Sequence, residues 1–158
     1  MVTETKFEGG NLIVTRVYQA SREAVFDAWI ETSKVKQWWG CAECTDVRSE
    51  IEPKVGGKYN HHMTIDGEFE APGFAVFTEY DPPARLAYAS PDPDDPMVIT
   101  VDFTEVEGGT LVTLVHSNIP DITVEGDVEL REIIRSGWTA ATDKLGAFLS
   151  KTTQTENA

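Results

Sequence analysis

The C-terminal part of the sequence carries a stripe of apolar residues at helical spacing. The stripe consists of Leu130, Ile134, Trp138, Ala141, Leu145 and Phe148. This period predicts an amphipathic helix over about residues 127–149, with polar residues such as Glu132 and Asp143 on the opposite face. At 1.5 Å per residue, such a helix is about 35 Å long, which is the length of a small β-sheet. Because the stripe needs a sheet to cover it, the chain is expected to adopt an α+β fold.

Residues 45–117 are expected to supply that sheet, because their apolar residues alternate with polar ones. Six strands are predicted, at 46–52, 58–65, 69–80, 85–89, 97–105 and 110–117. Asp66-Gly67 indicates a type I′ hairpin, and Glu107-Gly108-Gly109 indicates the last hairpin. Pro72-Gly73 marks a bend or bulge within the third of these strands. Consecutive strands joined by short turns should pair antiparallel.

One strand and two short helices are predicted before this segment. The β-branched and aromatic run at 12–18 predicts the strand. Ser21 can cap the first helix, and Thr32 or Ser33 can cap a second helix that ends at Gly40. The whole order, β-α-α-β6-α, predicts one curved antiparallel sheet of about seven strands around the long C-terminal helix.

Length and charge limit the organisation and the partners. The 158 residues suit one domain, which we assign to 1–150, and the small polar residues 151–158 are expected to form a disordered tail. The formal net charge of −14 disfavours nucleic acid and anionic membrane as partners. No apolar segment is long enough to span a bilayer. Two cysteines do not make a disulfide scaffold, so a cytoplasmic location is expected.

Short motifs follow one another along most of the chain. They are Arg16, Ala20-Ser21-Arg22-Glu23-Ala24-Val25-Phe26-Asp27-Ala28-Trp29, Trp38-Trp39-Gly40, Val55-Gly56-Gly57-Lys58-Tyr59, Asp66-Gly67, Gly73-Phe74, Glu79-Tyr80-Asp81-Pro82-Pro83-Ala84-Arg85-Leu86, Gly137-Trp138 and Leu145. In this order they resemble the activator of heat-shock protein 90 ATPase homologue-like family of the START-like (SRPBCC) superfamily. The resemblance implies the helix-grip fold, an internal cavity between helix and sheet for an apolar small molecule, and no cofactor. Cys41 departs from the family, which commonly has a proline there.

The candidate cavity residues come from the inward faces of the strands and the helix. They are Tyr59, His61, Met63, Phe77, Phe103, Ile134, Trp138 and Ala141. His61 is either a polar hook for a ligand or a hydrogen-bonded core histidine. Gly137, beside Trp138, either admits the sheet closely or leaves space for a ligand. If the protein binds a small molecule, we expect it against this turn of the helix.

The sequence predicts no metal site and no catalytic residue. Cys41-Ala42-Glu43-Cys44 could be half a zinc site or a redox pair, but zinc needs two further ligands. The pair also follows a helix C-terminus, where the helix dipole raises thiol pKa values. Neither role is expected for it. No nucleophile elbow, phosphate loop or HExxH motif is present.

Three functions remain open. The first is a binding domain for a hydrophobic or aromatic small molecule, and we expect binding rather than catalysis. The second is a chaperone-associated regulator of the heat-shock protein 90 type, for which the family's additional N-terminal domain is missing from this sequence. The third is a polyketide cyclase-like enzyme, which would need His61 to pair with an inward carboxylate.

Overall fold

The computed structural model describes residues 2–156. The strands are β1 (Glu4–Glu8), β2 (Asn11–Tyr18), β3 (Cys44–Ile51), β4 (Tyr59–Ile65), β5 (Phe69–Gly73), β6 (Val76–Asp81), β7 (Arg85–Ala89), β8 (Val98–Val106), β9 (Gly109–Ser117), β10 (Thr123–Val124) and β11 (Val128–Glu129). The α-helices are α1 (Arg22–Ile30), α2 (Thr32–Val35) and α3 (Leu130–Glu156). The predicted α+β fold, with a large curved antiparallel sheet and a long C-terminal helix, is confirmed.

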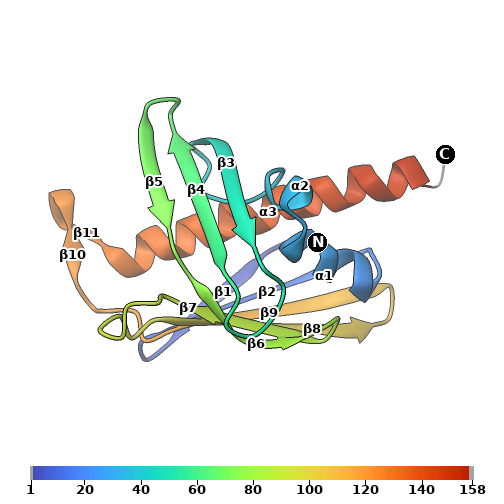
Figure 1. The fold of residues 1–158 in the computed structure, drawn as a ribbon, viewed down its shortest axis with the longest axis horizontal. Coiled ribbons are helices and arrows are strands. Elements are labelled where there is room, and N and C mark those ends of the chain that lie inside the picture. The colour runs from blue at the N-terminus through green and yellow to red at the C-terminus, as the bar shows by residue number, and fades with distance from the viewer. Residues whose placement is uncertain (1, 157–158) are drawn as a thin grey trace.

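The strands are divided between two sheets and a small ribbon. The larger sheet has six strands in the order β1-β2-β9-β8-β7-β6, and the smaller has the order β3-β4-β5. A bridge between Lys58 and Val76 links the two sheets, together with backbone hydrogen bonds such as that from the Phe77 amide to the Gly57 carbonyl at 3.0 Å. Figure 1 shows α3 running lengthwise over the larger sheet while β3, β4 and β5 cross beside it. The β10–β11 ribbon lies at the opposite end of the molecule from the C-terminus.

The predicted continuous strand at 69–80 is wrong, because the chain changes sheets within it. β5 pairs with β4 and ends at Gly73, and β6 begins at Val76 and pairs with β7. The pairing of β5 with β4 runs through Pro72 and ends at Gly73, so the break follows the Pro72-Gly73 pair. The Asp66-Gly67 turn is confirmed, since both residues have positive φ, of 56° and 67°.

The sequence patterns do not predict three of the strands. β1 is a polar edge strand that pairs with β2, and β10 and β11 have two residues each. Because β11 occupies Val128–Glu129, α3 begins at Leu130 rather than at 127. The helix continues to Glu156, beyond the predicted end at 149. The last two residues of the tail expected at 151–158 lie outside the described residues.

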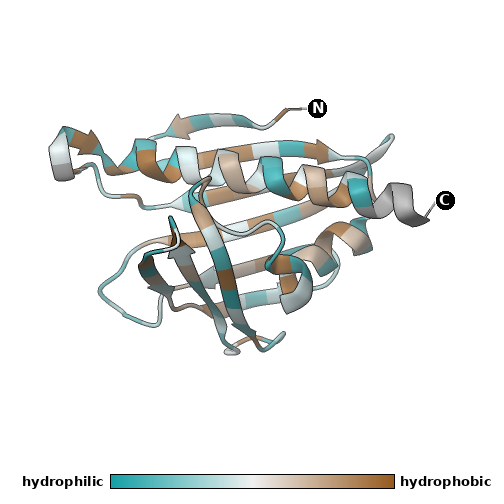
Figure 2. Ribbon diagram, turned by 90° about the horizontal axis from the view of Figure 1, so that it is seen from above, coloured by the Kyte–Doolittle hydropathy of each residue, from teal (hydrophilic) through white to brown (hydrophobic). Residues whose placement is uncertain are grey.

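The two short helices hold an aromatic core against the larger sheet. The Ser21 cap is confirmed, because its Oγ accepts a hydrogen bond from the Ala24 amide at 3.1 Å. The predicted Thr32 or Ser33 cap of α2 is wrong, since Glu31 occupies that position without a side-chain hydrogen bond. Trp38 Nε1 donates to the Ala28 carbonyl at 2.8 Å and so ties the turn after α2 to α1. Figure 2 shows hydrophobic and hydrophilic residues alternating along α3, as the apolar stripe predicts.

Candidate functional site

A groove of about 300 Å³ lies beside the middle of α3. The helix contributes Ile133, Ile134, Gly137, Trp138 and Ala141, and the facing elements contribute Trp39, Gly40, Cys41, Met63 and His116. Met63 lies on β4 and His116 on β9, while the other three follow α2. Most of these side chains are apolar, so the groove suits an uncharged molecule with a large carbon surface.

Trp138 is held rigidly in the wall of this groove. Its ring stacks on that of Trp29, with centroids 6.0 Å apart, and meets Trp39 edge-on at 5.8 Å. Its Nε1–H donates to His116 Nδ1 at 3.0 Å. These three contacts hold the indole in the wall of the groove.

Gly137 leaves open space next to that indole. A Cβ built on Gly137 would meet no atom within 4 Å outside its own stretch of helix. The sheet therefore does not pack closely against Gly137. The space next to this glycine is open instead. A glycine inside a helix costs about 1 kcal/mol relative to alanine, and no packing contact here explains that cost.

His116 supplies the polar group of the groove, which sequence reasoning did not include among the site residues. An indole N–H can only donate, so His116 Nδ1 must accept and the neutral ring carries its proton on Nε2. That Nε2 lies 3.3 Å from Met97 Sδ. Burial lowers the pKa of His116 to about 4, so the ring is neutral at pH 7. The alternating buried residues of β9, Thr110, Val112, Leu114 and His116, were the signal that could have found it.

Apart from His61, the predicted site residues separate into two groups. Met63, Ile134, Trp138 and Ala141 line the groove. Tyr59, Phe77 and Phe103 do not reach it, because they are almost fully buried in the aromatic core. The Tyr59 and Phe77 rings lie 4.8 Å apart, and Phe103 packs on Phe26 at 5.0 Å.

His61 is buried but does not line the groove. Its ring stacks on that of Trp39, with centroids 3.9 Å apart, and Trp39 lines the groove whereas His61 lines a second hollow on the smaller sheet. Nδ1 is hydrogen-bonded to Ser49 Oγ at 2.7 Å, and Nε2 is buried without a partner among the described residues. Burial lowers the pKa of His61 to about 3. The side chain that bonds it is a hydroxyl and not the carboxylate that an acid–base pair requires.

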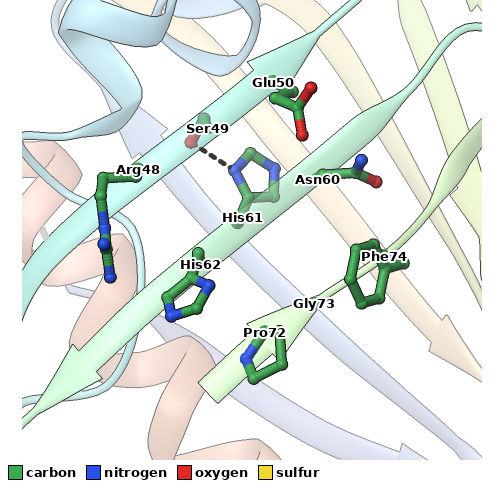
Figure 3. A pocket seen from close by; sticks show the side chains of 9 residues that line it. All are labelled: Arg48, Ser49, Glu50, Asn60, His61, His62, Pro72, Gly73 and Phe74. Atoms are coloured by element: carbon green, nitrogen blue, oxygen red, sulfur yellow. Dashed lines mark hydrogen bonds between the residues drawn. The ribbon is translucent and has the colours of Figure 1, made fainter. Parts of the chain in front are cut away.

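A second hollow, of about 220 Å³, lies on the smaller sheet (Figure 3). Charged, polar and apolar residues line it together, and they include the predicted site residue His61. The lining residues are Arg48, Ser49, Glu50, Asn60, His61, His62, Pro72, Gly73 and Phe74. Glu70, on the neighbouring strand, binds His62 Nε2 at 2.7 Å and Arg48 Nη2 at 2.9 Å. The His62 hydrogen bond lowers the pKa of the exposed Glu70 carboxyl. Since these charges already pair with one another in solvent, we assign this hollow no ligand.

Within residues 2–156, no cluster of three or more His, Cys, Asp and Glu side chains could hold a metal ion. The helices of the same part of the chain are all too short or too polar to cross a membrane.

One family model matches most of the chain, and solved structures share its fold. The model of the activator of Hsp90 ATPase homolog 1-like proteins matches residues 19–150. A Rhodobacter sphaeroides structure aligns with a TM-score of 0.78 at 17% identity, covering 96% of this chain and 99% of that one. An AHSA1-like protein from Aeromonas hydrophila aligns with a TM-score of 0.72 at 22% identity, and the alignment covers 90% of this chain and 94% of that one. A Mycobacterium smegmatis structure aligns with a TM-score of 0.75 at 20% identity, and the alignment covers 96% of this chain and 99% of that one. No curated protein matches the chain.

Proposed function

The chain belongs to the activator of Hsp90 ATPase homolog 1-like family, and on this basis we propose that it binds a small apolar or aromatic molecule in the groove beside α3. The observation that carries the proposal is the open volume at Gly137, next to the immobilised ring of Trp138. Ligand sites combine such apolar walls with a few placed polar groups. Here the polar group is the neutral imidazole of His116, whose acceptor nitrogen already binds Trp138, so the walls offer mainly carbon surface.

Size and charge narrow the class of ligand. A groove of about 300 Å³ lies at the lower end of the range for small-molecule sites and suits a molecule of one or two rings. The net charge of −14 repels anions at long range. Trp138 already occupies the acceptor nitrogen of His116, so the groove has little to offer a strongly polar ligand. We therefore infer a neutral ligand that binds mainly through its carbon surface.

The test combines a ligand panel with one groove-filling variant. Neutral one-ring and two-ring compounds are added to the protein, and tryptophan fluorescence and the melting temperature are recorded. We expect binders to quench or shift the fluorescence and to raise the melting temperature. Gly137→Leu places a side chain in the open space and should weaken binding by about tenfold or more.

Ser136→Leu is the matched control, because Ser136 is exposed and is not one of the residues that line the groove. It adds a similar volume to the neighbouring helix position and should leave affinity unchanged. A panel without any binder, or equal loss of affinity in both variants, would contradict the proposal.

A chaperone contact is the second candidate, favoured by exposed apolar side chains at one end of the molecule. Ile122, Val124, Val128 and Ile133, on and beside the β10–β11 ribbon, are all between 38% and 51% exposed. Such a patch is typical of protein contacts. If it serves a chaperone, the protein should bind heat-shock protein 90 and change its ATPase rate, and Val128→Asp should abolish both effects. We do not propose polyketide cyclisation, because His61 bonds the Ser49 hydroxyl rather than a carboxylate.

A further inference from the structure

Two sulfur atoms, of Met63 and Cys44, lie together where the chain leaves α2, and Cys41 interacts electrostatically with Cys44 on the same turn. A Cβ built on Gly40 would lie 2.8 Å from Met63 Sδ and 3.0 Å from Cys44 Sγ, so both sulfurs face the same bare backbone position. The Cys44 amide donates to the Cys41 carbonyl at 3.1 Å, which closes a four-residue turn. In such a turn the first and last Cα atoms lie within about 7 Å of each other. Cys41 and Met63 also share the wall of the groove.

Neither thiol is part of a disulfide, Cys44 Sγ donates to the Asp46 carbonyl at 3.3 Å, and a cation lies nearby. Cys41 and Cys44 are free cysteines, and both are partly exposed. Lys144 Nζ donates to the carbonyls of Trp39 and Cys41, each at 3.1 Å. These bonds hold the ammonium group where it interacts electrostatically with both cysteines.

We propose that Cys41, Cys44 and Met63 form a binding site for a soft monovalent metal ion, Cu(I). Thiolate and thioether sulfur are the ligands that select Cu(I) over harder ions. A structural zinc site would require further nitrogen, oxygen or thiolate ligands. The described residues contain no cluster of three or more His, Cys, Asp and Glu side chains that would supply them.

The charges at such a site balance. Binding displaces the proton of each thiol, so one Cu(I) and two thiolates carry a single negative charge. The Lys144 ammonium offsets that charge. This position requires a glycine. Gly40 has a φ of +93°, which other residues rarely adopt, and a side chain there would collide with the two adjacent sulfurs.

This inference goes beyond the proposed function, since it requires no organic ligand. The two sites share Cys41 and Met63 but not Gly137, which lies on the α3 side of the groove. Gly137→Leu should therefore leave Cu(I) affinity unchanged while it blocks the groove. That variant separates failure of one proposal from failure of the other.

The experiment is an anaerobic titration of the reduced full-length protein with Cu(I) against a chromogenic Cu(I) chelator, with Zn(II) titrated in parallel. We expect one Cu(I) per chain, a thiolate-to-copper absorption band, and X-ray absorption that shows sulfur neighbours. Cys41→Ser and Cys44→Ser should each weaken binding by more than about 100-fold. Met63→Leu should weaken it by about tenfold, and so should Lys144→Gln.

Met97→Leu is the matched control, because Met97 contacts His116 and not the cysteines. It should bind Cu(I) like the wild type. The proposal is overturned if the Cys41→Ser, Cys44→Ser double variant binds Cu(I) as tightly as the wild type. Equal affinities for the Met63→Leu and Met97→Leu variants, or tighter binding of Zn(II) than of Cu(I), would overturn it too.

Discussion

Two buried tyrosines in the core differ in whether their hydroxyl groups have a partner. Tyr59 OH donates to the Trp29 carbonyl at 2.6 Å, which fixes β4 against α1. Tyr88 OH is buried but has no partner among the described residues. The two rings pack together, with centroids 4.6 Å apart, so their surroundings are otherwise similar.

Removing each hydroxyl should therefore have opposite consequences. Tyr59→Phe leaves the Trp29 carbonyl buried without its donor and should lower the free energy of unfolding by about 1–2 kcal/mol. Tyr88→Phe removes a desolvated polar group and should leave that free energy unchanged or raise it by up to about 1 kcal/mol. Urea denaturation of both variants measures the difference. A larger loss for Tyr88→Phe than for Tyr59→Phe would contradict this account.

Two histidines inside the fold make stability depend on pH. Burial lowers the pKa of His116 to about 4 and that of His61 to about 3, whereas both have the ordinary value of about 6.5 when the chain is unfolded. Between these values the unfolded chain binds more protons than the folded protein does. The free energy of unfolding should therefore be highest above about pH 6.5 and fall as the pH decreases.

Each histidine should contribute on the order of 1–2 kcal/mol to the loss between pH 7 and pH 5. His116→Gln keeps an acceptor for Trp138 but cannot titrate, and His61→Gln likewise removes the second group. In the double variant the difference in unfolding free energy between pH 7 and pH 5 should be much smaller than in the wild type. The same loss in both proteins would show that other groups cause it.

At the scale of elements, α3 contains two glycines with different surroundings. Gly137 faces the open groove, where a Cβ meets nothing. A Cβ on Gly146 would overlap the guanidinium group of Arg16. Arg16 in turn donates to Thr3 and Asp143, which fastens β2 to the helix. One glycine is therefore needed for packing and the other is not.

Gly137→Ala should raise the free energy of unfolding by about 0.5–1 kcal/mol, because alanine is the better helix former. Gly146→Ala should gain little or lower stability, because Arg16 must leave its ion pair with Asp143. Both values can be obtained by chemical denaturation at pH 7. Equal gains at the two positions would mean that Arg16 adjusts without loss.

At the scale of the whole molecule, the net charge of −14 opposes the compact state. Surface ion pairs such as Lys34–Glu31 offset little of this repulsion, because both partners are solvated. Raising NaCl from about 20 to 300 mM shortens the screening length and should raise the melting temperature by several degrees. Thermal denaturation at both salt concentrations measures this shift in melting temperature. A constant or falling melting temperature at the higher concentration would show that ion pairs outweigh the repulsion.

Features that depend on neighbouring residues could be predicted without the structure. The apolar stripe of α3, the Ser21 cap and the Asp66-Gly67 turn each follow from residues a few positions apart, since helix periodicity, capping and positive φ are local properties. The helix-grip order of elements followed from them and from the family resemblance. The N-terminal edge strand β1 could not be predicted, because an edge strand exposed to solvent does not need alternating apolar and polar residues.

The position of the groove depends on elements that are distant in the chain. Periodicity assigned Tyr59 and Phe103 to the inside but could not separate a filled interior from an open one, because that depends on how ring volumes fit together. Likewise, no local pattern places His116 against Trp138, or Met63 against Cys44 across Gly40. These contacts form where β9, β4 and the turn after α2 converge on one stretch of α3. Only packing in three dimensions brings these elements together.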